Sequence, residues 1–136
     1  MKQFVLSVVI AWTFVNVLKP ILTWIREKRI NLKTMFTNGG MPSGHTVSVT
    51  SLTSALYLET GFSPVFVFGV VFALLVIYDA LKVRTIIGQQ SRIINQLMEK
   101  EPGFEKLDEQ VGHKTSEVVA SLVIGIVIPV LVYALF

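Results

Sequence analysis

The sequence predicts an all-α fold, a polytopic membrane bundle of about four transmembrane helices with one amphipathic helix. Composition is the first reason, because 52% of the residues are hydrophobic and only 15% are charged, whereas about 25% of a soluble domain is charged. Pattern is the second reason, because four apolar runs alternate with polar segments that carry helix-start and helix-end residues. With 136 residues, the chain is expected to form one integral-membrane domain, residues 1–136.

The first apolar run extends from Phe4 to Trp24, close to the ~20 residues that a spanning helix needs. Pro20 removes a backbone hydrogen bond and is expected to kink this helix. Lys19 is expected to snorkel, and Trp24 to lie at a membrane interface. The polar stretch 26–38 then predicts a loop at the membrane surface.

The next two runs, from Thr46 to Leu58 and from Pro64 to Tyr78, are predicted to form an antiparallel helical hairpin because a short segment joins them. The earlier run is rich in Ser and Thr, which let helices approach closely and hydrogen-bond in lipid. We therefore expect it to be buried among its neighbours. Gly61 is the predicted C-cap of this helix, and Pro64 is the predicted first-turn residue of the next.

The segment from Thr85 to Lys100 has a different pattern, in which isoleucines and Leu97 alternate with polar residues at helical spacing. This pattern predicts an amphipathic helix that lies on the bilayer or packs on the bundle. Pro102 and Gly103 are expected to end it. The last apolar run extends from Val118 to Phe136.

The basic residues predict the topology. Four spans place segments 25–45 and 79–117 on one side of the membrane, and these segments hold ten of the twelve Lys and Arg residues. The positive-inside rule makes that side cytoplasmic and puts both termini outside, so a site among these loops faces the cytoplasm. The ten residues are Arg26, Lys28, Arg29, Lys33, Lys82, Arg84, Arg92, Lys100, Lys106 and Lys114.

Charge and cysteine content exclude some partners and chemistries. The net charge of +3 is better explained by membrane topology than by a nucleic-acid partner. The chain has no cysteine, which excludes disulfides and thiolate chemistry. The expected partner is the lipid bilayer, and because four short helices bury little surface, a homodimer is also expected.

The stretch from Gly39 to His45 joins a basic polar segment to a hydrophobic run. Its glycines leave the backbone free to turn, and Pro42 fits at or just before a helix start. Ser43 is the predicted N-cap. The amides that follow, from Gly44 to Thr46, would then point out of the helix end, where anions and above all phosphate bind. The side chain of His45 could exchange protons with a bound phosphate ester.

Other reactive side chains are expected at the same membrane surface. Asp79 and Arg84 lie at the end of the third run, and His113 and Glu117 lie at the start of the fourth. Both histidines of the chain are therefore predicted to meet where three helix ends gather. An ion pair between Asp79 and Arg84 that only closes a helix end is the alternative role for those two residues.

Two motifs at these positions resemble those of a known superfamily. Pro42-Ser43-Gly44-His45 resembles the central signature of the type 2 phosphatidic acid phosphatase superfamily, which includes the vanadium haloperoxidases, and Gly112-His113-x-x-x-Glu117 resembles its third motif. The whole chain resembles a smaller, divergent branch, the acid phosphatase/vanadium-dependent haloperoxidase-related membrane proteins. The further residues that carry this resemblance are Gly39, Gly40, Met41, Tyr78, Asp79, Ala80, Val83, Arg84, Gly88, Gln90 and Asn95.

The resemblance implies a role for each matching residue. His113 is the expected nucleophile and forms a phosphohistidine, Glu117 orients its ring, and His45 is the general acid for the leaving group. The resemblance requires no metal and no other cofactor. The expected phosphate-binding groups are Ser43, Gly44, Arg84 and Lys33, and the expected supporting residues are Asp79, Pro42, Gln90 and Asn95.

The implied function is hydrolysis of a lipid phosphate monoester or diphosphate, such as phosphatidic acid, phosphatidylglycerophosphate or a polyprenyl diphosphate. The chain departs from the superfamily pattern at two arginines. It has no Arg-Pro pair, and Leu107 occupies the arginine position before the third motif. Two alternatives therefore stay open, namely a non-catalytic protein that binds or transports a phospholipid or polyprenyl phosphate, and a structural membrane subunit.

Overall fold

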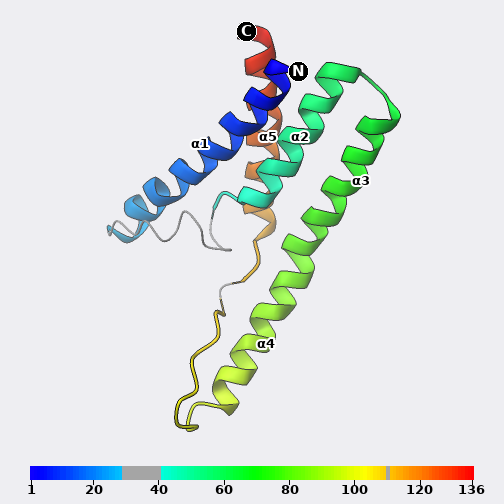
Figure 1. Cartoon of the computed structure of the whole chain (residues 1–136). Coiled ribbons are helices and arrows are strands. Elements are labelled where there is room, and N and C mark those ends of the chain that lie inside the picture. The colour runs from blue at the N-terminus through cyan, green and yellow to red at the C-terminus, as the bar shows by residue number, and fades with distance from the viewer. Residues whose placement is uncertain (29–40, 110) are drawn as a thin grey trace.

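The computed structural model describes residues 1–28, 41–109 and 111–136, which form a helical protein (Figure 1). Neither a strand nor a sheet occurs within these ranges. The elements in chain order are α1 (Lys2–Glu27), α2 (Gly44–Thr60), α3 (Pro64–Tyr78), the π-helical segment η2 (Asp79–Val83), α4 (Arg84–Leu97) and α5 (Thr115–Leu135).

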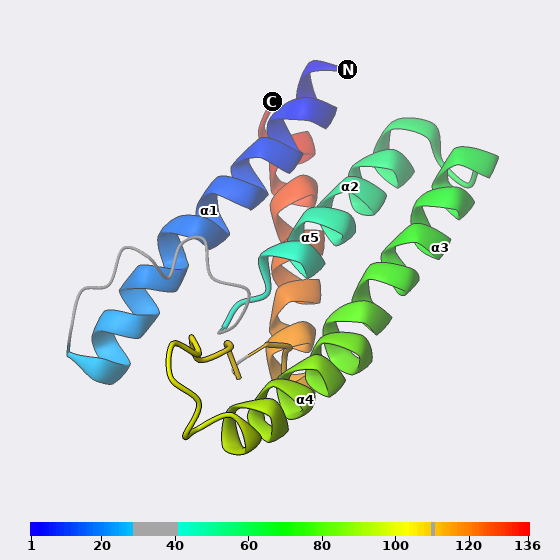
Figure 2. The ribbon, with the colours of Figure 1, turned by 60° about the horizontal axis from the view of Figure 1, so that its bottom comes forward.

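Helix α2 is the centre of the bundle. It packs against α1, α3 and α5, and α1 also packs against α5. Figure 2 shows α2 running between α3 on one side and the α1–α5 pair on the other. Small residues allow this close packing, because a Cβ added at Gly125 of α5 would lie 2.7 Å from Cβ of Thr50. The Ser- and Thr-rich helix is therefore buried among its neighbours, as its composition predicts.

The helical membrane bundle is confirmed, with a difference in the number of spans. Three stretches within the described residues are long and apolar enough to cross a bilayer, namely Lys2–Ile25, Pro64–Leu97 and Thr115–Leu135. Helix α2 has 17 residues and, with its many hydroxyl side chains, is not one of these three. It stands inside the bundle, where neighbouring helices shield its polar side chains from lipid.

The hairpin between α2 and α3 has the predicted caps. Gly61 ends α2 with a positive φ of 64°, a conformation that favours glycine. Ser63 caps α3 by accepting a hydrogen bond from the amide of Phe66, and Pro64 is the first helical residue. The rings of Tyr57 and Phe66 pack at 5.2 Å across the hairpin.

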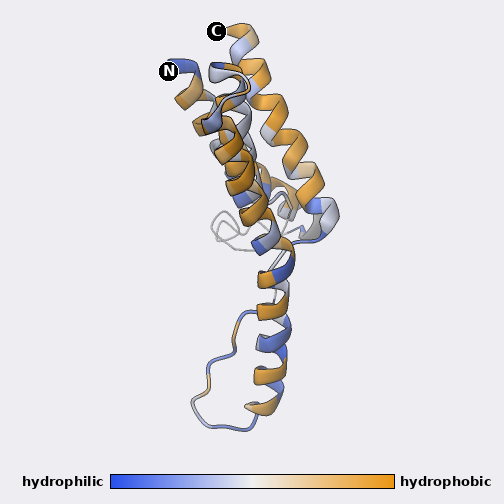
Figure 3. Cartoon of the chain, turned by 90° about the vertical axis from the view of Figure 1, so that its right-hand side faces the viewer, coloured by the Kyte–Doolittle hydropathy of each residue, from blue (hydrophilic) through white to orange (hydrophobic). Residues whose placement is uncertain are grey.

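The predicted amphipathic helix is confirmed as α4, but it is not a separate element that lies on the bilayer surface or packs on the bundle. Segment η2 continues the helix after Tyr78, so that α3 and α4 form one rod that extends beyond the bundle (Figures 1 and 3). The rod spans Pro64–Leu97, 34 residues, or about 50 Å, against ~30 Å for the hydrocarbon core. The polar half of the rod, helix α4, therefore extends beyond the hydrocarbon layer that the bundle spans.

The chain ends lie together at one end of the bundle (Figure 1). The N-terminal ammonium group forms an ion pair with Glu59 at the end of α2, and Tyr133 near the end of α5 donates to Oε2 of Glu59 at 2.6 Å. The starts of α2 and α5 lie at the opposite end. This arrangement agrees with the predicted topology, in which both termini share one side.

Candidate functional site

Segment η2 interrupts the regular hydrogen bonding of the α3–α4 rod. The amide of Arg84 bonds to the carbonyl of Asp79, five residues earlier, before α-helical bonding resumes. Where hydrogen bonds between residues five apart give way to bonds between residues four apart, one backbone carbonyl has no partner within the helix. Here it is the carbonyl of Ala80. This carbonyl accepts a hydrogen bond from the backbone N–H of His113 at 3.1 Å. The irregular turn therefore anchors the residue that the sequence predicts as the nucleophile.

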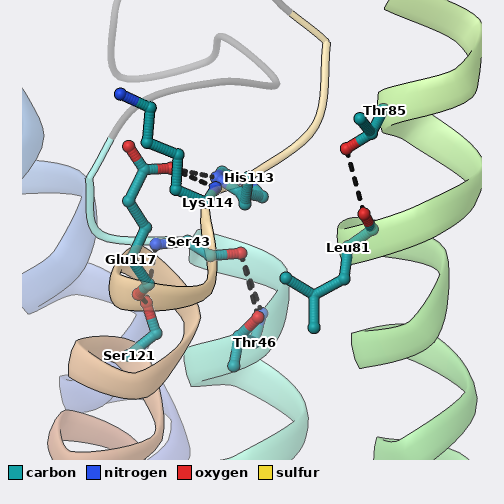
Figure 4. Close-up of polar contacts among 8 residues, drawn as sticks. All are labelled: Ser43, Thr46, Leu81, Thr85, His113, Lys114, Glu117 and Ser121. Atoms are coloured by element: carbon teal, nitrogen blue, oxygen red, sulfur yellow. Dashed lines mark hydrogen bonds and ion pairs between the residues drawn. The ribbon is translucent and has the colours of Figure 1, made fainter.

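Gly112 holds the same loop against the first turn of α4. Its φ is 106°, and an added Cβ would lie 2.8 Å from both the amide nitrogen and Oγ1 of Thr85. Thr85 in turn donates to the carbonyl of Leu81 at 3.0 Å (Figure 4). No side chain fits at residue 112 without moving the loop or the helix, so glycine is required next to His113.

The imidazole of His113, which precedes the N-cap of α5, is held by Glu117 in the first turn of that helix. The His113 side chain is 2% exposed, and its Nδ1 lies 3.2 Å from Oε2 of Glu117. The same carboxylate oxygen accepts the backbone N–H of Lys114 at 3.2 Å (Figure 4), as part of the capping box that starts α5. One glutamate thus caps the helix and orients the ring, which leaves Nε2 as the nitrogen for reaction.

The environment of His113 favours the neutral ring. Burial lowers the pKa of His113 below its ordinary value of 6.5, the contact with Glu117 opposes this shift, and the charges of Lys19 and Arg84 add to the lowering. A neutral imidazole has the free lone pair that a nucleophile or a base requires.

His45 lies in the first turn of α2 with an exposed side chain. Partial burial lowers its pKa, the charges of Arg84, Lys19 and His113 lower it further, and Asp79 opposes them. The two histidines are therefore within electrostatic reach of each other. Arg84 also forms a 2.7 Å ion pair with Asp79 through Nε, so the predicted salt bridge at this helix end is present.

Ser43 links the start of α2 to the start of α5 (Figure 4). Its Oγ caps α2 by accepting the amide of Thr46 at 3.4 Å, and the Thr46 hydroxyl donates to the same oxygen at 3.0 Å. The Ser43 amide donates to Oγ of Ser121 at 2.7 Å, and Ser121 donates to the carbonyl of Glu117 at 2.6 Å. Ser43 is fully buried, so these bonds fix the two helix starts relative to each other.

Lys19 is the residue that sequence reasoning missed. It was expected to snorkel, but it is only 7% exposed, and its Nζ lies 3.8 Å from the place that a Cβ at Gly44 would take. The ammonium group of α1 therefore faces the start of α2. The available signal was a lone lysine within an apolar helix, because an ionisable residue in a membrane span is usually functional.

A cavity of about 830 Å³ brings these elements together. It lies between α1, η2, α4 and the start of α5, and its wall combines Lys19, His113 and Glu117 with two further lysines. Ser43, Gly44, His45, Asp79 and Arg84 are outside this wall. The described lining residues are Lys19, Leu22, Thr23, Met41, Leu81, Lys82, Thr85, Val111, Gly112, His113, Lys114, Thr115 and Glu117.

The comparisons with known proteins identify the family of the chain. The sequence pattern of the Divergent PAP2 family matches residues 1–128. The chain belongs to the Divergent PAP2 family. It is also similar to YuiD of Bacillus subtilis (strain 168), which is described as an uncharacterized membrane protein, with 32% identity over 90% of this chain and 89% of YuiD. No solved structure matches.

Two of the residues predicted to support the site of this Divergent PAP2 protein, Gln90 and Asn95, lie on α4 and are not in the wall of the cavity. Asn95 lies on α4, where its side chain bonds to both the amide and the carbonyl of Leu107 at 2.8 and 2.9 Å and fastens the returning loop. Gln90 is exposed on the same helix. Lys33 lies outside the described residues. Pro42 is buried directly before the N-cap of α2, as predicted.

The arrangement suits an anionic ligand more than a metal ion. Among the described side chains of this Divergent PAP2 protein, no group of three or more His, Asp or Glu is placed to hold a metal. Positive charge converges instead, because Lys19, Lys82 and Lys114 all line the cavity around His113. Such a site can bind a phosphoryl group and present a neutral imidazole to it.

Proposed function

We propose that this protein is a membrane-embedded phosphatase that hydrolyses a lipid phosphate monoester or diphosphate through a phosphohistidine on His113. The observation that carries the proposal is the buried imidazole of His113, held through Nδ1 by Glu117 at 3.2 Å on the wall of a lysine-lined cavity. Burial lowers the pKa of this histidine, which keeps it neutral and nucleophilic at pH 7.

The reaction has two steps. In the first, Nε2 of His113 attacks phosphorus, the bond from phosphorus to the leaving oxygen breaks, and His45 gives that oxygen a proton. In the second, a water molecule attacks the phosphohistidine, its proton passes to His45, and inorganic phosphate leaves as His113 is restored. Lys19 and Arg84 stabilise the negative charge on the phosphoryl oxygens in both steps.

The lowered pKa of His45 also fits this reaction cycle. Burial lowers the pKa of His45, and the nearby charges of Arg84 and Lys19 lower it further. A bound phosphate dianion reverses that local field, because it adds an opposite charge beside the ring. Substrate binding would therefore raise the pKa of His45, so that its ring carries the proton that the leaving group needs.

Two features support a lipid substrate and a cytoplasmic site. The starts of α2 and α5 bring the proposed groups to one end of the membrane bundle, where the phosphate of a bilayer lipid lies. Ten of the twelve basic residues belong to the segments at that end, which the positive-inside rule assigns to the cytoplasm.

The test is phosphate release by the purified protein in detergent, with phosphatidic acid, phosphatidylglycerophosphate and a polyprenyl diphosphate as substrates. We expect H113N to abolish release and E117Q to lower kcat/KM at least about tenfold. E59Q is the matched control for E117Q, because Glu59 lies at the far end of the bundle. A phosphoenzyme trapped by acid quenching should be present in the wild type and absent in H113N.

Full activity in H113N would exclude the phosphohistidine mechanism. If the wild type binds phosphatidic acid tightly without releasing phosphate, and H45A abolishes that binding, the protein is a phospholipid-binding or transport protein instead. If neither histidine substitution changes binding or release, the polar residues serve only the assembly of the helices.

A further inference from the structure

A second cavity, of about 530 Å³, lies between α2, α3 and α5 on the membrane-embedded side of the site. Helix α3 packs against α2 and has no comparable contact with α5 over the described residues, so a groove remains between α3 and α5 with α2 as its floor. The lining is mostly aliphatic and aromatic. Its residues are Thr50, Thr53, Ser54, Tyr57, Leu58, Phe66, Val70, Ala73, Leu74, Ile77, Leu122, Ile126 and Val130.

We propose that this groove binds the hydrocarbon tail of the phosphorylated lipid whose head group binds at His113. The inference rests on the proposed function and adds a tail-binding site to it. Its occupant is a single acyl or prenyl chain, because the walls that α3 and α5 contribute are apolar and the groove lies in the bilayer layer, where hydrocarbon chains are the available ligand.

Continuity with the first cavity is the main argument. Ile77 lines the groove and Leu81 lines the site cavity, and four residues along one helix face make a single turn. On α5, Glu117 lines the site cavity and Leu122 lines the groove, but residues five apart lie on different faces of a helix, so the continuity follows the rod of α3 and η2. A lipid with its phosphate at His113 therefore has its tail directed at the open end of the groove.

Aromatic rings lie at the far end of the groove. Tyr57 and Phe66 pack at 5.2 Å, and Phe62 packs on Phe66 at 5.7 Å. From Ile77 to Phe66 the groove follows α3 for roughly 16 Å, at 1.5 Å per residue. The groove thus has a fixed length, and binding should strengthen with tail length until the tail reaches these rings.

Val70 and Val71 provide a matched pair of substitutions. Val70 lines the groove, whereas its neighbour Val71 is 52% exposed and lies outside the lining. V70F fills the groove, and V71F adds the same bulk to the outer face of the same helix. Neither residue belongs to the proposed catalytic groups.

The experiment measures binding of the lipid tail and does not depend on catalytic turnover. The protein is reconstituted in phosphatidylcholine vesicles that contain a trace of phosphatidic acid with a diazirine near the end of one acyl chain, illuminated, and mapped by mass spectrometry. We expect labelling of the groove residues of α3 and α5, at least tenfold weaker labelling in V70F, and unchanged labelling in V71F. Phosphatidylcholine with the same diazirine should label the groove at least tenfold less.

Equal labelling by the two lipids would overturn the proposal, because the groove would then hold bulk lipid. Cross-links from the groove to a second copy of the chain would also overturn it. Groove labelling in a protein that releases no phosphate would support the tail site and reject only the catalytic proposal. Where release is measurable, V70F should lower kcat/KM for long-chain phosphatidic acid at least tenfold and leave a water-soluble phosphate monoester unaffected.

Discussion

Nζ of Lys19 lies 3.8 Å from the position of a Cβ at Gly44, so that a cation from the first helix faces the first residue of the second. The N-terminal end of a helix attracts anions, and Lys19 adds a full positive charge that is shielded from water. The two features together favour an anion between α1 and α2, next to the cavity that contains His113.

Replacing Lys19 by methionine should weaken the binding of orthovanadate or inorganic phosphate by about tenfold or more, because a charged hydrogen bond contributes about 1.5–3 kcal/mol. The pKa of His45 and that of His113 should both rise, since Lys19 lowers both. Vanadate inhibition and NMR titration of the two rings measure these effects. K2M is the control at the far end of α1, and unchanged vanadate affinity in K19M would remove Lys19 from the anion site.

Gly112→Ala should displace the loop that carries His113. The new Cβ would meet Thr85 at 2.8 Å, and φ is 106°, so we expect a loss of roughly 1–3 kcal/mol of stability and a fall in activity. Gly103→Ala is the matched control, because Gly103 also has a positive φ, of 84°, with nothing within 4 Å of its added Cβ. Thermal unfolding in detergent measures stability, and equal effects of the two substitutions would argue against the Thr85 contact.

Ser121→Ala should loosen the start of α2 from the start of α5. It removes the acceptor of the buried Ser43 amide, and leaving a buried donor unsatisfied costs about 1–3 kcal/mol. Ser116→Ala is the control, since Ser116 is an exposed serine in the first turn of the same helix. Hydrogen exchange at the first turn of α2 should become faster in S121A only, and no change there would contradict the role of the Ser43–Ser121 bond.

The predicted and missed features differ in physical origin. Helix α3 was predicted with its observed bounds, because Pro64 marks its start locally and Tyr78 precedes the first charges. The change to π-helical hydrogen bonding at η2 and the direction of α4 were not predictable, because no residue pattern signals a π-helical turn. Helix α4 also depends on a distant loop, whose residue Leu107 bonds to Asn95.

The sequence predicts which reactive residues gather at one membrane surface. It predicts less well how their side chains are arranged there. His113 directly precedes Lys114, the N-cap of α5, and Glu117 is in the first turn of that helix, so a carboxylate that reaches back to the N-cap also comes close to His113. The role of Ser43 in joining two helices and the approach of Lys19 to α2 depend on tertiary packing, which residue spacing does not encode.

Folding stability should decrease as the pH falls below 6.5. Both histidines have a pKa below that ordinary value in the folded protein, so the unfolded chain binds more protons between the folded and the unfolded pKa. Stability from this source is complete above 6.5 and is lost as the pH falls toward the folded values. Thermal unfolding at pH 7.5 and 5.5 tests this, and H113N should show a smaller difference between the two than the wild type.

If the phosphatase proposal holds, kcat/KM should reach its maximum on the acid side of pH 6.5. Nucleophilic His113 must be neutral, which sets the rising limb, and His45 must carry a proton, which sets the falling limb. The pKa of each is lowered in the free protein, so the protonated form of His45 is scarce above 6.5. H45Q should flatten the falling limb, and a maximum well above pH 7 would contradict the assignment.

The continuous helical path through α3, η2 and α4 has a mechanical consequence. Helix continues from the part in the bundle to the part beyond it, and the carbonyl of Ala80, which accepts a hydrogen bond from His113, lies at the junction where the bonding pattern changes. A load applied to the protruding end of α4 would therefore be transmitted to this junction. It would turn the rod about its membrane-embedded half and change the position of the imidazole.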